Sequence, residues 1–230
     1  MMYRSALGVG LMAAALTLLF ASPEVAAAQP FQWAGAVGGN DHWYEIVSVH
    51  GPTWTQARDL AASRTWSGMS GHLATISSAS EQSFIQNLLG GMSLVPSNDP
   101  CCGTSVFIGG FQNPSSPTYA EPAGGWQWVT GEAFLFQNWN TSPVVEPNED
   151  SPGENFLLMN TGRGGPQPPG PGLLGYWNDG GDNNYGNVGY VIEYSAVPVP
   201  EPSAQWLLAI GLSMFIPAAH RKRRRNGGTS

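Results

Sequence analysis

The stretch TWTQARDLAASRTWSGMSGHLATISSASEQSFIQNLLGG, residues 53–91, decides the fold class because it contains two helical patterns separated by a short strand pattern. Its first residue, Thr53, is of a type that caps helix N-termini by accepting a backbone hydrogen bond. Apolar side chains then recur at the three- and four-residue spacing of one helix face, at Trp54, Ala57, Leu60 and Ala61. We therefore predict a first helix that begins directly after Thr53.

A strand and a second helix are predicted in the remainder of this stretch. Residues 72–76 form a short run with apolar and β-branched side chains, which favours a strand. Ser78 and Glu81 have the three-residue spacing of a capping box, so a helix is expected after Ser78. Its apolar face comprises Phe84, Ile85, Leu88 and Leu89. Gly90 and Gly91 are expected to end this helix.

Outward from these helices, the sequence is rich in short strands and turns. Aromatic and β-branched side chains predict a strand before the first helix, at residues 41–49. Further strands are predicted after the second helix, at residues 106–111, 126–130, 155–159 and 189–194. Two helices followed by loop-rich strands predict an α+β domain, which we place at residues 41–195 with an N-terminal linker at residues 29–40. Long connections, which are often functional, lie at residues 112–125, 131–154 and 160–188.

The charged residues are few and unevenly distributed. Only 11% of the 230 residues are charged. Between residues 29 and 200, three arginines stand against fourteen acidic residues, and seven of these acids lie between Glu146 and Glu193. Nucleic acids require a basic surface, so we expect no nucleic-acid partner.

The N-terminal 28 residues have the layout of a secretory signal peptide. Arg4 precedes an apolar run at residues 6–20, and small residues at 26–28 provide a cleavage site before Gln29. An uncleaved anchor is the alternative, but the apolar run is short for a membrane span. We therefore predict that residues 1–28 are a signal peptide and that the protein is exported.

The C-terminal residues form three parts in a fixed order. The motif Val199, Pro200, Glu201 and Pro202 precedes a marginal transmembrane segment at residues 206–219 and an arginine-rich cluster at residues 221–225. Residues 196–225 together resemble a PEP-CTERM sorting signal, followed by a tail at residues 226–230. The resemblance implies a Gram-negative bacterium, an exosortase-type processing enzyme as partner, a transient membrane anchor, and delivery to the cell envelope or extracellular space. An ordinary C-terminal anchor, the alternative, also predicts the cell surface.

Oxygen-bearing side chains gather in two loop segments of the acidic region. These side chains belong to Glu146, Asn148, Glu154, Asn178 and Asp179. Mixed carboxylate and amide oxygens suit Ca²⁺, whereas the histidine and cysteine ligands that Zn²⁺ prefers are missing at this spacing. Carboxylates accept and amides donate hydrogen bonds, as a pair of adjacent sugar hydroxyls requires. The alternative is that these residues only form turns.

Residues 41–195 resemble the C-type lectin-like family through motifs that follow one another in the family's order. The motifs are Trp54-x-x-Ala57, Gly71-His72-Leu73-Ala74-Thr75-Ile76, Phe107-Ile108-Gly109-Gly110, Trp126-Gln127-Trp128-Val129-Thr130-Gly131-Glu132, Phe136-x-x-Trp139, Glu146-Pro147-Asn148, Trp177-Asn178-Asp179 and Val191-Ile192-Glu193. The resemblance implies two helices, short antiparallel strands and a long calcium-binding loop region. It also implies that Ca²⁺ and sugar share the ligands Glu146, Asn148, Glu154, Asn178 and Asp179, that Pro147 follows a cis peptide bond, and that mannose-type sugars are favoured.

The chain departs from this family in its cysteines. The family's usual pair of disulfide bridges corresponds here to Ala61 with Ile192, and to about Phe156 with Asp182. An apolar contact can replace the first bridge, but an aspartate opposite a phenylalanine does not replace the second. The cysteines that are present, Cys101 and Cys102, are adjacent, which favours a strained local bridge or an intermolecular link over redox catalysis.

The sequence therefore predicts a Ca²⁺-dependent carbohydrate-binding module that takes mannose-type sugars or exopolysaccharide. The first alternative is an envelope or biofilm-matrix domain of the same fold that binds proteins or has a structural role. The second is a glycosidase with paired carboxylates. We expect no enzyme, because a bound divalent ion keeps these carboxylates ionised rather than ready to act as acids. His42, His50, His72 and His220 are scattered, and we expect no metal role for them.

Overall fold

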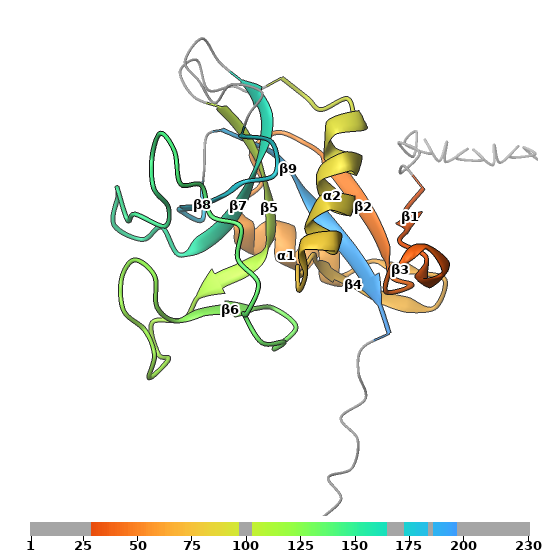
Figure 1. Cartoon of the computed structure of the whole chain (residues 1–230), viewed down its shortest axis with the longest axis horizontal. Coiled ribbons are helices and arrows are strands. Elements are labelled where there is room, and N and C mark those ends of the chain that lie inside the picture. Colours follow the sequence, from red (N-terminus) through yellow and green to blue (C-terminus); the bar gives the residue numbers. More distant parts are fainter. Residues whose placement is uncertain (1–28, 97–102, 165–172, 184–185, 197–230) are drawn as a thin grey trace, which may run out of the picture.

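The computed structural model describes residues 29–96, 103–164, 173–183 and 186–196 (Figure 1). The predicted signal peptide at residues 1–28, the sorting motif at residues 199–202 and both cysteines lie outside the described residues. Within the described ranges, no helix combines the length and the apolar character needed to cross a membrane.

The helices begin where the sequence predicts them. Helix α1 (Trp54–Ala62) starts with a complete capping box, in which Thr53 accepts from the backbone of Gln56 and the Gln56 side chain accepts from the backbone of Thr53. Helix α2 (Ala79–Gly91) starts with the Ser78 side chain accepting from the backbone N–H of Glu81.

Helix α2 differs from the sequence prediction at its N-terminal end. The Glu81 side chain does not complete a capping box with Ser78. It accepts hydrogen bonds from Ser77 and from the hydroxyl of Tyr44, because this carboxylate is buried against the sheet. The helix ends at the predicted glycines, since Gly91 is its last residue, and the cap, Met92, has extended backbone angles.

The strands form one mixed sheet. Its strands are β1 (Phe31–Gln32), β2 (Trp43–Ser48), β3 (Thr65–Trp66), β4 (Met69–Leu73), β5 (Gly103–Gln112), β6 (Trp126–Trp128), β7 (Phe156–Gly164), β8 (Trp177–Gly180) and β9 (Asn187–Ser195). The main order is β1-β2-β9-β5-β7-β8, while β3 and β4 extend from β9 and β6 pairs with β5. All pairs are antiparallel, as expected, except β5 with β9, which are parallel. The predicted α+β class is confirmed.

The two helices pack on opposite faces of the sheet. Side chains alternate between the faces of a strand, and central strand β9 divides its residues accordingly. Val191 belongs to the core cluster that contains Ile85 and Leu89 of α2. Tyr190, Ile192 and Tyr194 belong to the cluster that contains Trp54, Ala57 and Ala61 of α1. Each helix therefore closes one of two apolar cores that share the sheet.

The positions expected to lack disulfide bridges are held by other contacts. Ala61 and Ile192 are fully buried in the same apolar cluster. Asp182 accepts hydrogen bonds from the backbone and the hydroxyl of Thr55, 2.8 and 2.9 Å away, at the N-terminus of α1. A carboxylate is favourable at this end of a helix. The polar residue that the sequence left unexplained thus joins the loop after β8 to α1.

Part of the segment predicted as a linker belongs to the sheet. Strand β1 pairs with β2, with Phe31 opposite Tyr44 and Gln32 opposite Trp43. A short 3-10 helix, η1 (Gly35–Val37), follows before β2 begins. The sequence did not predict β1, because its pairing depends on a partner strand rather than on local propensity. The glycine-rich residues 34–41 that follow it favoured a linker.

Candidate functional site

The long loop at residues 131–154 is held against strand β8 by backbone hydrogen bonds. Trp177 donates to the carbonyl of Asn138 at 2.8 Å, and Asn140 donates to the carbonyl of Trp177 at 2.9 Å. Glu146 then donates to the carbonyl of Asn140 at 2.8 Å. This ladder carries the Glu-Pro-Asn segment to the edge strand of the sheet, where β8 lies beside β7 (Figure 1).

An aromatic cluster keeps β8 in place beneath the loop. The Trp177 side chain is fully buried, and its ring lies 5.7 Å from those of Trp128 and Phe136 and 5.9 Å from that of Trp139, all near perpendicular. Its indole N–H donates to Gln82 of α2 at 2.9 Å. Sequence analysis did not predict β8, because its short and polar Trp-Asn-Asp-Gly sequence has little strand propensity.

Asp179 is the buried centre of the site. It is 2% exposed, and its carboxylate accepts hydrogen bonds from the backbone N–H groups of Asn148 at 3.2 Å and Glu149 at 3.1 Å. The peptide bond between Glu146 and Pro147 is cis. The loop at residues 131–154 and strand β8, which are far apart in the sequence, are therefore in direct contact.

Three carboxylates converge at this point. Glu149, Glu154 and Asp179 each provide one oxygen, and these oxygens all lie within 4.8 Å of one another. Glu149 was not among the residues singled out from the sequence. The signal that could have found it is its position directly after Asn148 in an acidic loop, and its backbone adopts a positive φ of 51°. Glu149 also accepts from the backbone N–H of Gly153 at 2.7 Å.

Several oxygens of the site are buried without a donor. Among the described residues, Oε2 of Glu146 and Oε2 of Glu149 have no hydrogen-bond partner and almost no solvent contact. None of the ion pairs among the described residues involves an acid of this loop. Buried polar atoms are ordinarily satisfied, so these two carboxylate oxygens are available to an additional group such as a cation.

The electrostatics of the site disfavour several negative charges together. Burial, followed by the neighbouring carboxylate of Asp179, raises the pKa of Glu146 to about 8. Burial is also the main cause that raises the pKa of Glu154, and the charge of Asp179 adds to it. A cation at this position would remove the penalty, because it stabilises the ionised form of each carboxylate.

The predicted site residues do not all occupy equivalent positions. Glu146, Asn148, Glu154 and Asp179 lie around the same point through the contacts given above. Oδ1 of Asn148 also accepts from the backbone N–H of Asp150 at 2.9 Å, and the amide nitrogen of Asn148 makes no hydrogen bond with the described residues. Asn178 is half-buried beside Asp179 on β8, opposite Leu158, and its side chain makes no hydrogen bond with the residues that the structure describes.

Among the histidines named from the sequence, His42 and His72 have structural partners, while His220 lies outside the described residues. Nδ1 of His42 lies 2.6 Å from the buried carboxylate of Glu193, and Nε2 of His72 lies 2.9 Å from the hydroxyl of Ser195. The hydrogen bond with Glu193 raises the pKa of His42.

Comparison with known proteins relates the chain to lectin-like proteins. No protein-family model matches it. It is 27% identical over 112 residues to lithostathine of Bos taurus, a match that covers 49% of the chain and 56% of that protein. Among solved structures, it is similar to the C-type lectin CEL-I from Cucumaria echinata, with 18% identity and a TM-score of 0.47 over 68% of this chain and 91% of that one. It is also similar to the cow C-type carbohydrate-recognition domain of CD23, determined in the presence of a GlcNAc2Man3 oligosaccharide, with 21% identity and a TM-score of 0.42 over 66% and 86% of the chains.

Proposed function

We propose that the protein is a Ca²⁺-dependent carbohydrate-binding module that favours mannose-type sugars. The ion would be held by the carboxylates of Glu146, Glu154 and Asp179 and the amide oxygens of Asn148 and Asn178. The carboxylate of Glu149, which the sequence analysis missed, would also face the ion. Binding would be reversible, with a calcium affinity in the range of weak extracellular sites, roughly 10⁻⁴ to 10⁻³ M.

The observation that carries this proposal is the convergence of three carboxylates without a counter-charge among the described residues. Oxygens of Glu149, Glu154 and Asp179 lie within 4.8 Å of one another, and Oε2 of Glu149 and Oε2 of Glu146 are buried without a hydrogen-bond partner in the described part of the chain. Calcium takes six to eight oxygen ligands in irregular geometry, so it suits a loop site of carboxylates and amides. A smaller ion such as Mg²⁺ requires near-ideal octahedral geometry and retains several waters.

The same residues offer the hydrogen bonds that a sugar needs. Each of two adjacent hydroxyls can donate to a carboxylate and accept from an amide. Glu146 supplies the first kind of group, and Asn148 has an amide nitrogen that no described residue occupies. The hydroxyl oxygens would complete the ligand shell of the ion. The Glu-Pro-Asn order, which the family resemblance links to mannose-type sugars, supports that preference.

A glycan array with and without EDTA tests the proposal. We expect binding to mannose-type glycans that EDTA abolishes. The double variant Glu146→Gln with Asn148→Asp should change the preferred sugar, because it exchanges the charges of the two groups that meet the hydroxyls. Asp59→Asn, on the exposed surface of α1, serves as the matched control. Binding that EDTA does not affect, or no glycan binding at all, would contradict the proposal and favour a protein-binding or structural domain.

The terminal segments support a proposal on location. We propose export directed by residues 1–28, followed by sorting through residues 196–225 and removal of the C-terminal anchor by an exosortase-type enzyme. Both segments carry the charge and hydropathy pattern of such signals. Mass spectrometry of the mature protein checks this directly. The expected mass is that of a chain that begins at Gln29 and lacks the arginine-rich end. A mature protein that retains residues 1–28 would contradict the proposed export signal.

A further inference from the structure

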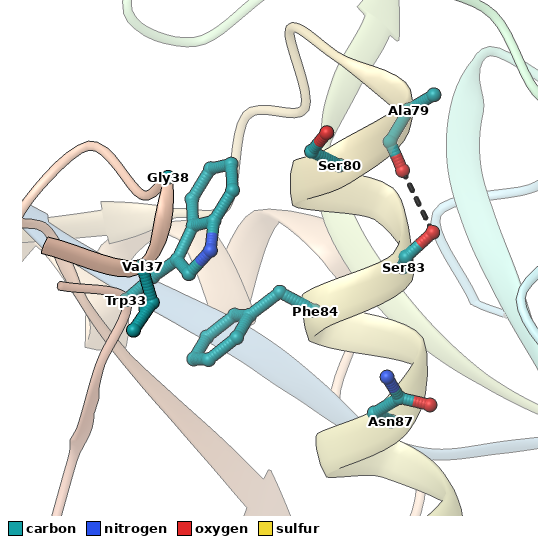
Figure 2. A pocket seen from close by; sticks show the side chains of 8 residues that line it. All are labelled: Trp33, Val37, Gly38, Ala79, Ser80, Ser83, Phe84 and Asn87. Atoms are coloured by element: carbon teal, nitrogen blue, oxygen red, sulfur yellow. Dashed lines mark hydrogen bonds between the residues drawn. The ribbon is translucent and has the colours of Figure 1, made fainter. Parts of the chain in front are cut away.

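A hollow of about 560 Å³ lies between the N-terminal segment and helix α2 (Figure 2). Its lining residues are Trp33, Val37, Gly38, Ala79, Ser80, Ser83, Phe84 and Asn87. The hollow adjoins β1, and β1 and β8 are opposite ends of the main strand order. It is therefore remote from the candidate calcium site and has a volume typical of ligand sites.

The N-terminal wall of the hollow is a folded structure. Trp33 donates to the carbonyl of His42 at 2.9 Å and accepts from the backbone of Asp41 at the same distance. The carboxylate of Asp41 accepts from the backbone N–H of Gly35 at 2.6 Å. Gly39 permits this turn, since a Cβ there would lie 2.1 Å from the carbonyl oxygen of Trp33. These contacts hold the indole of Trp33 in a defined position.

The aromatic part of the hollow is held from behind. The rings of Trp33 and Phe84 are stacked, with centroids 5.8 Å apart and planes 22° apart. Phe84 in turn meets the edge of Tyr44, at 5.4 Å and 62°. Tyr44 is fully buried and bonded to Glu81. The aromatic surface is thus preorganised, which lowers the entropic cost of binding a ligand.

The opposite wall is polar and carries no charge. Ser80, Ser83 and Asn87 follow one another at the spacing of one face of α2, and Figure 2 shows their side chains along the hollow. Ser83 donates to the carbonyl of Ala79 at 2.8 Å, so its oxygen remains free to accept. Ser80 and Asn87 make no side-chain hydrogen bond with the described part of the chain.

We infer that this hollow is a second, calcium-independent binding site for a neutral sugar residue of an oligosaccharide. The C–H face of a sugar ring packs against an aromatic surface such as that of Trp33, while its hydroxyls need the donors and acceptors of Ser80 and Asn87. A purely apolar ligand would leave these polar groups without partners, which is unfavourable. A charged ligand would find no counter-charge among the lining residues.

The test measures binding of cellohexaose to the full chain in EDTA, by isothermal titration calorimetry. EDTA silences the calcium site, so the result does not depend on the function proposed for that site. We expect saturable binding that Trp33→Ala weakens at least about tenfold and Asn87→Ala about threefold or more. Asn87 is exposed on a helix, where alanine has higher helix propensity, so its variant keeps the fold.

Phe31→Ala is the matched control, because Phe31 is an exposed aromatic residue of the same segment that does not line the hollow. We expect no change in affinity for this variant. Absence of binding in EDTA would overturn the inference, as would binding that Trp33→Ala and Asn87→Ala leave unchanged. Equal or tighter binding of an anionic oligogalacturonate would also overturn it, because the hollow would then not select neutral sugars.

Discussion

The sheet and the long loop both bury carboxylates, but they satisfy them differently. Glu45 and Glu193 of the sheet, and Glu81 of α2 against it, are at most 5% exposed. Glu193 is bonded to His42 at 2.6 Å and to the backbone of Thr75 at 2.9 Å. Glu45 is bonded to Arg64 and Tyr194, each at 2.5 Å. These acids have the partners that a buried charge requires.

The acids of the loop lack such partners. Asp179, on β8 beside the loop, accepts from the backbone N–H groups of Asn148 and Glu149, while Glu146 and Glu149 each leave one buried oxygen without a donor among the described residues. No described arginine or histidine forms an ion pair with them. The buried carboxylates of the core thus have partners within the chain, whereas those of the loop site have no counter-charge among the described residues, which is what the proposed cation would supply.

The largest expected effect is a loss of stability when a buried carboxylate of the core is removed. Glu193→Ala should lower the free energy of unfolding by about 3 kcal/mol, because it leaves the backbone of Thr75 and the ring of His42 without their buried partner. Urea unfolding measures this change. Asp59→Ala, which removes an exposed pair with Arg58, should cost less than about 1 kcal/mol. A Glu193 variant as stable as this control would show that the core acids do not stabilise the fold.

The second effect is a loss of calcium affinity when the buried carboxylate of the loop site is removed. Asp179→Asn should weaken calcium binding by about 100-fold or more, because it removes the buried central charge while keeping the shape of the side chain. Calcium titration followed by calorimetry measures the affinity. Glu193→Gln is the matched control in the sheet and should leave calcium affinity unchanged. An equal loss of calcium affinity in both variants would mean that the ion does not bind at Asp179.

The third effect has the opposite sign from the first. In EDTA at a pH above 8, where Glu146 is ionised, Glu146→Gln should raise the free energy of unfolding by up to about 1 kcal/mol, because it removes a negative charge that lies beside Asp179. In saturating calcium the same variant should be less stable than the unchanged protein. Thermal unfolding under both conditions measures this reversal. A variant that is destabilised in EDTA as well would show that the Glu146 charge already has a partner in the apo protein.

The smallest effect is a pH dependence. Burial and Asp179 raise the pKa of Glu146 from 4.5 to about 8, so its contribution to stability is present below pH 4.5 and is lost as the pH rises through 8. His42, whose pKa is raised above 6.5 by Glu193, adds a loss in the same direction at higher pH. Melting temperatures in EDTA should therefore fall from pH 5 to 8.

Two comparisons isolate the part due to Glu146. The fall in melting temperature with pH should be flatter in Glu146→Gln, and calcium should reduce it in the unchanged protein, because the ion stabilises the ionised carboxylate. The melting temperature could instead fall equally with pH in the unchanged protein in EDTA, in Glu146→Gln and in the unchanged protein with calcium. That result would contradict the assignment of this pH dependence to the loop.

Local patterns predicted the helices and the central strands, because spacing and caps act within a few residues. Thr53 and Ser78 cap the helices as their residue types require. Tertiary contacts decided the remainder. The Glu81 side chain accepts a hydrogen bond from Tyr44 instead of completing the capping box. Strands β1 and β8 form because partner strands are present.

The site was predicted in part for the same reason. Residue type and the family resemblance predicted a set of oxygen ligands, and two residues of that set, Asn148 and Asp179, are in contact in the structure. The sequence could not show that Glu149 turns inward, because its orientation depends on a left-handed backbone and on the backbone of Gly153. The hollow beside Trp33 was also beyond prediction, since it requires residues 33–38 to fold onto α2.

The most direct test of the account is an isothermal titration of Ca²⁺ into the protein at pH 8, with Mg²⁺ as the control ion. The account predicts saturable calcium binding with a dissociation constant of roughly 10⁻⁴ to 10⁻³ M, much weaker magnesium binding, and loss of the signal in Asp179→Asn. The absence of saturable calcium binding in the unchanged protein would contradict the central claim that the loop carboxylates are completed by a cation.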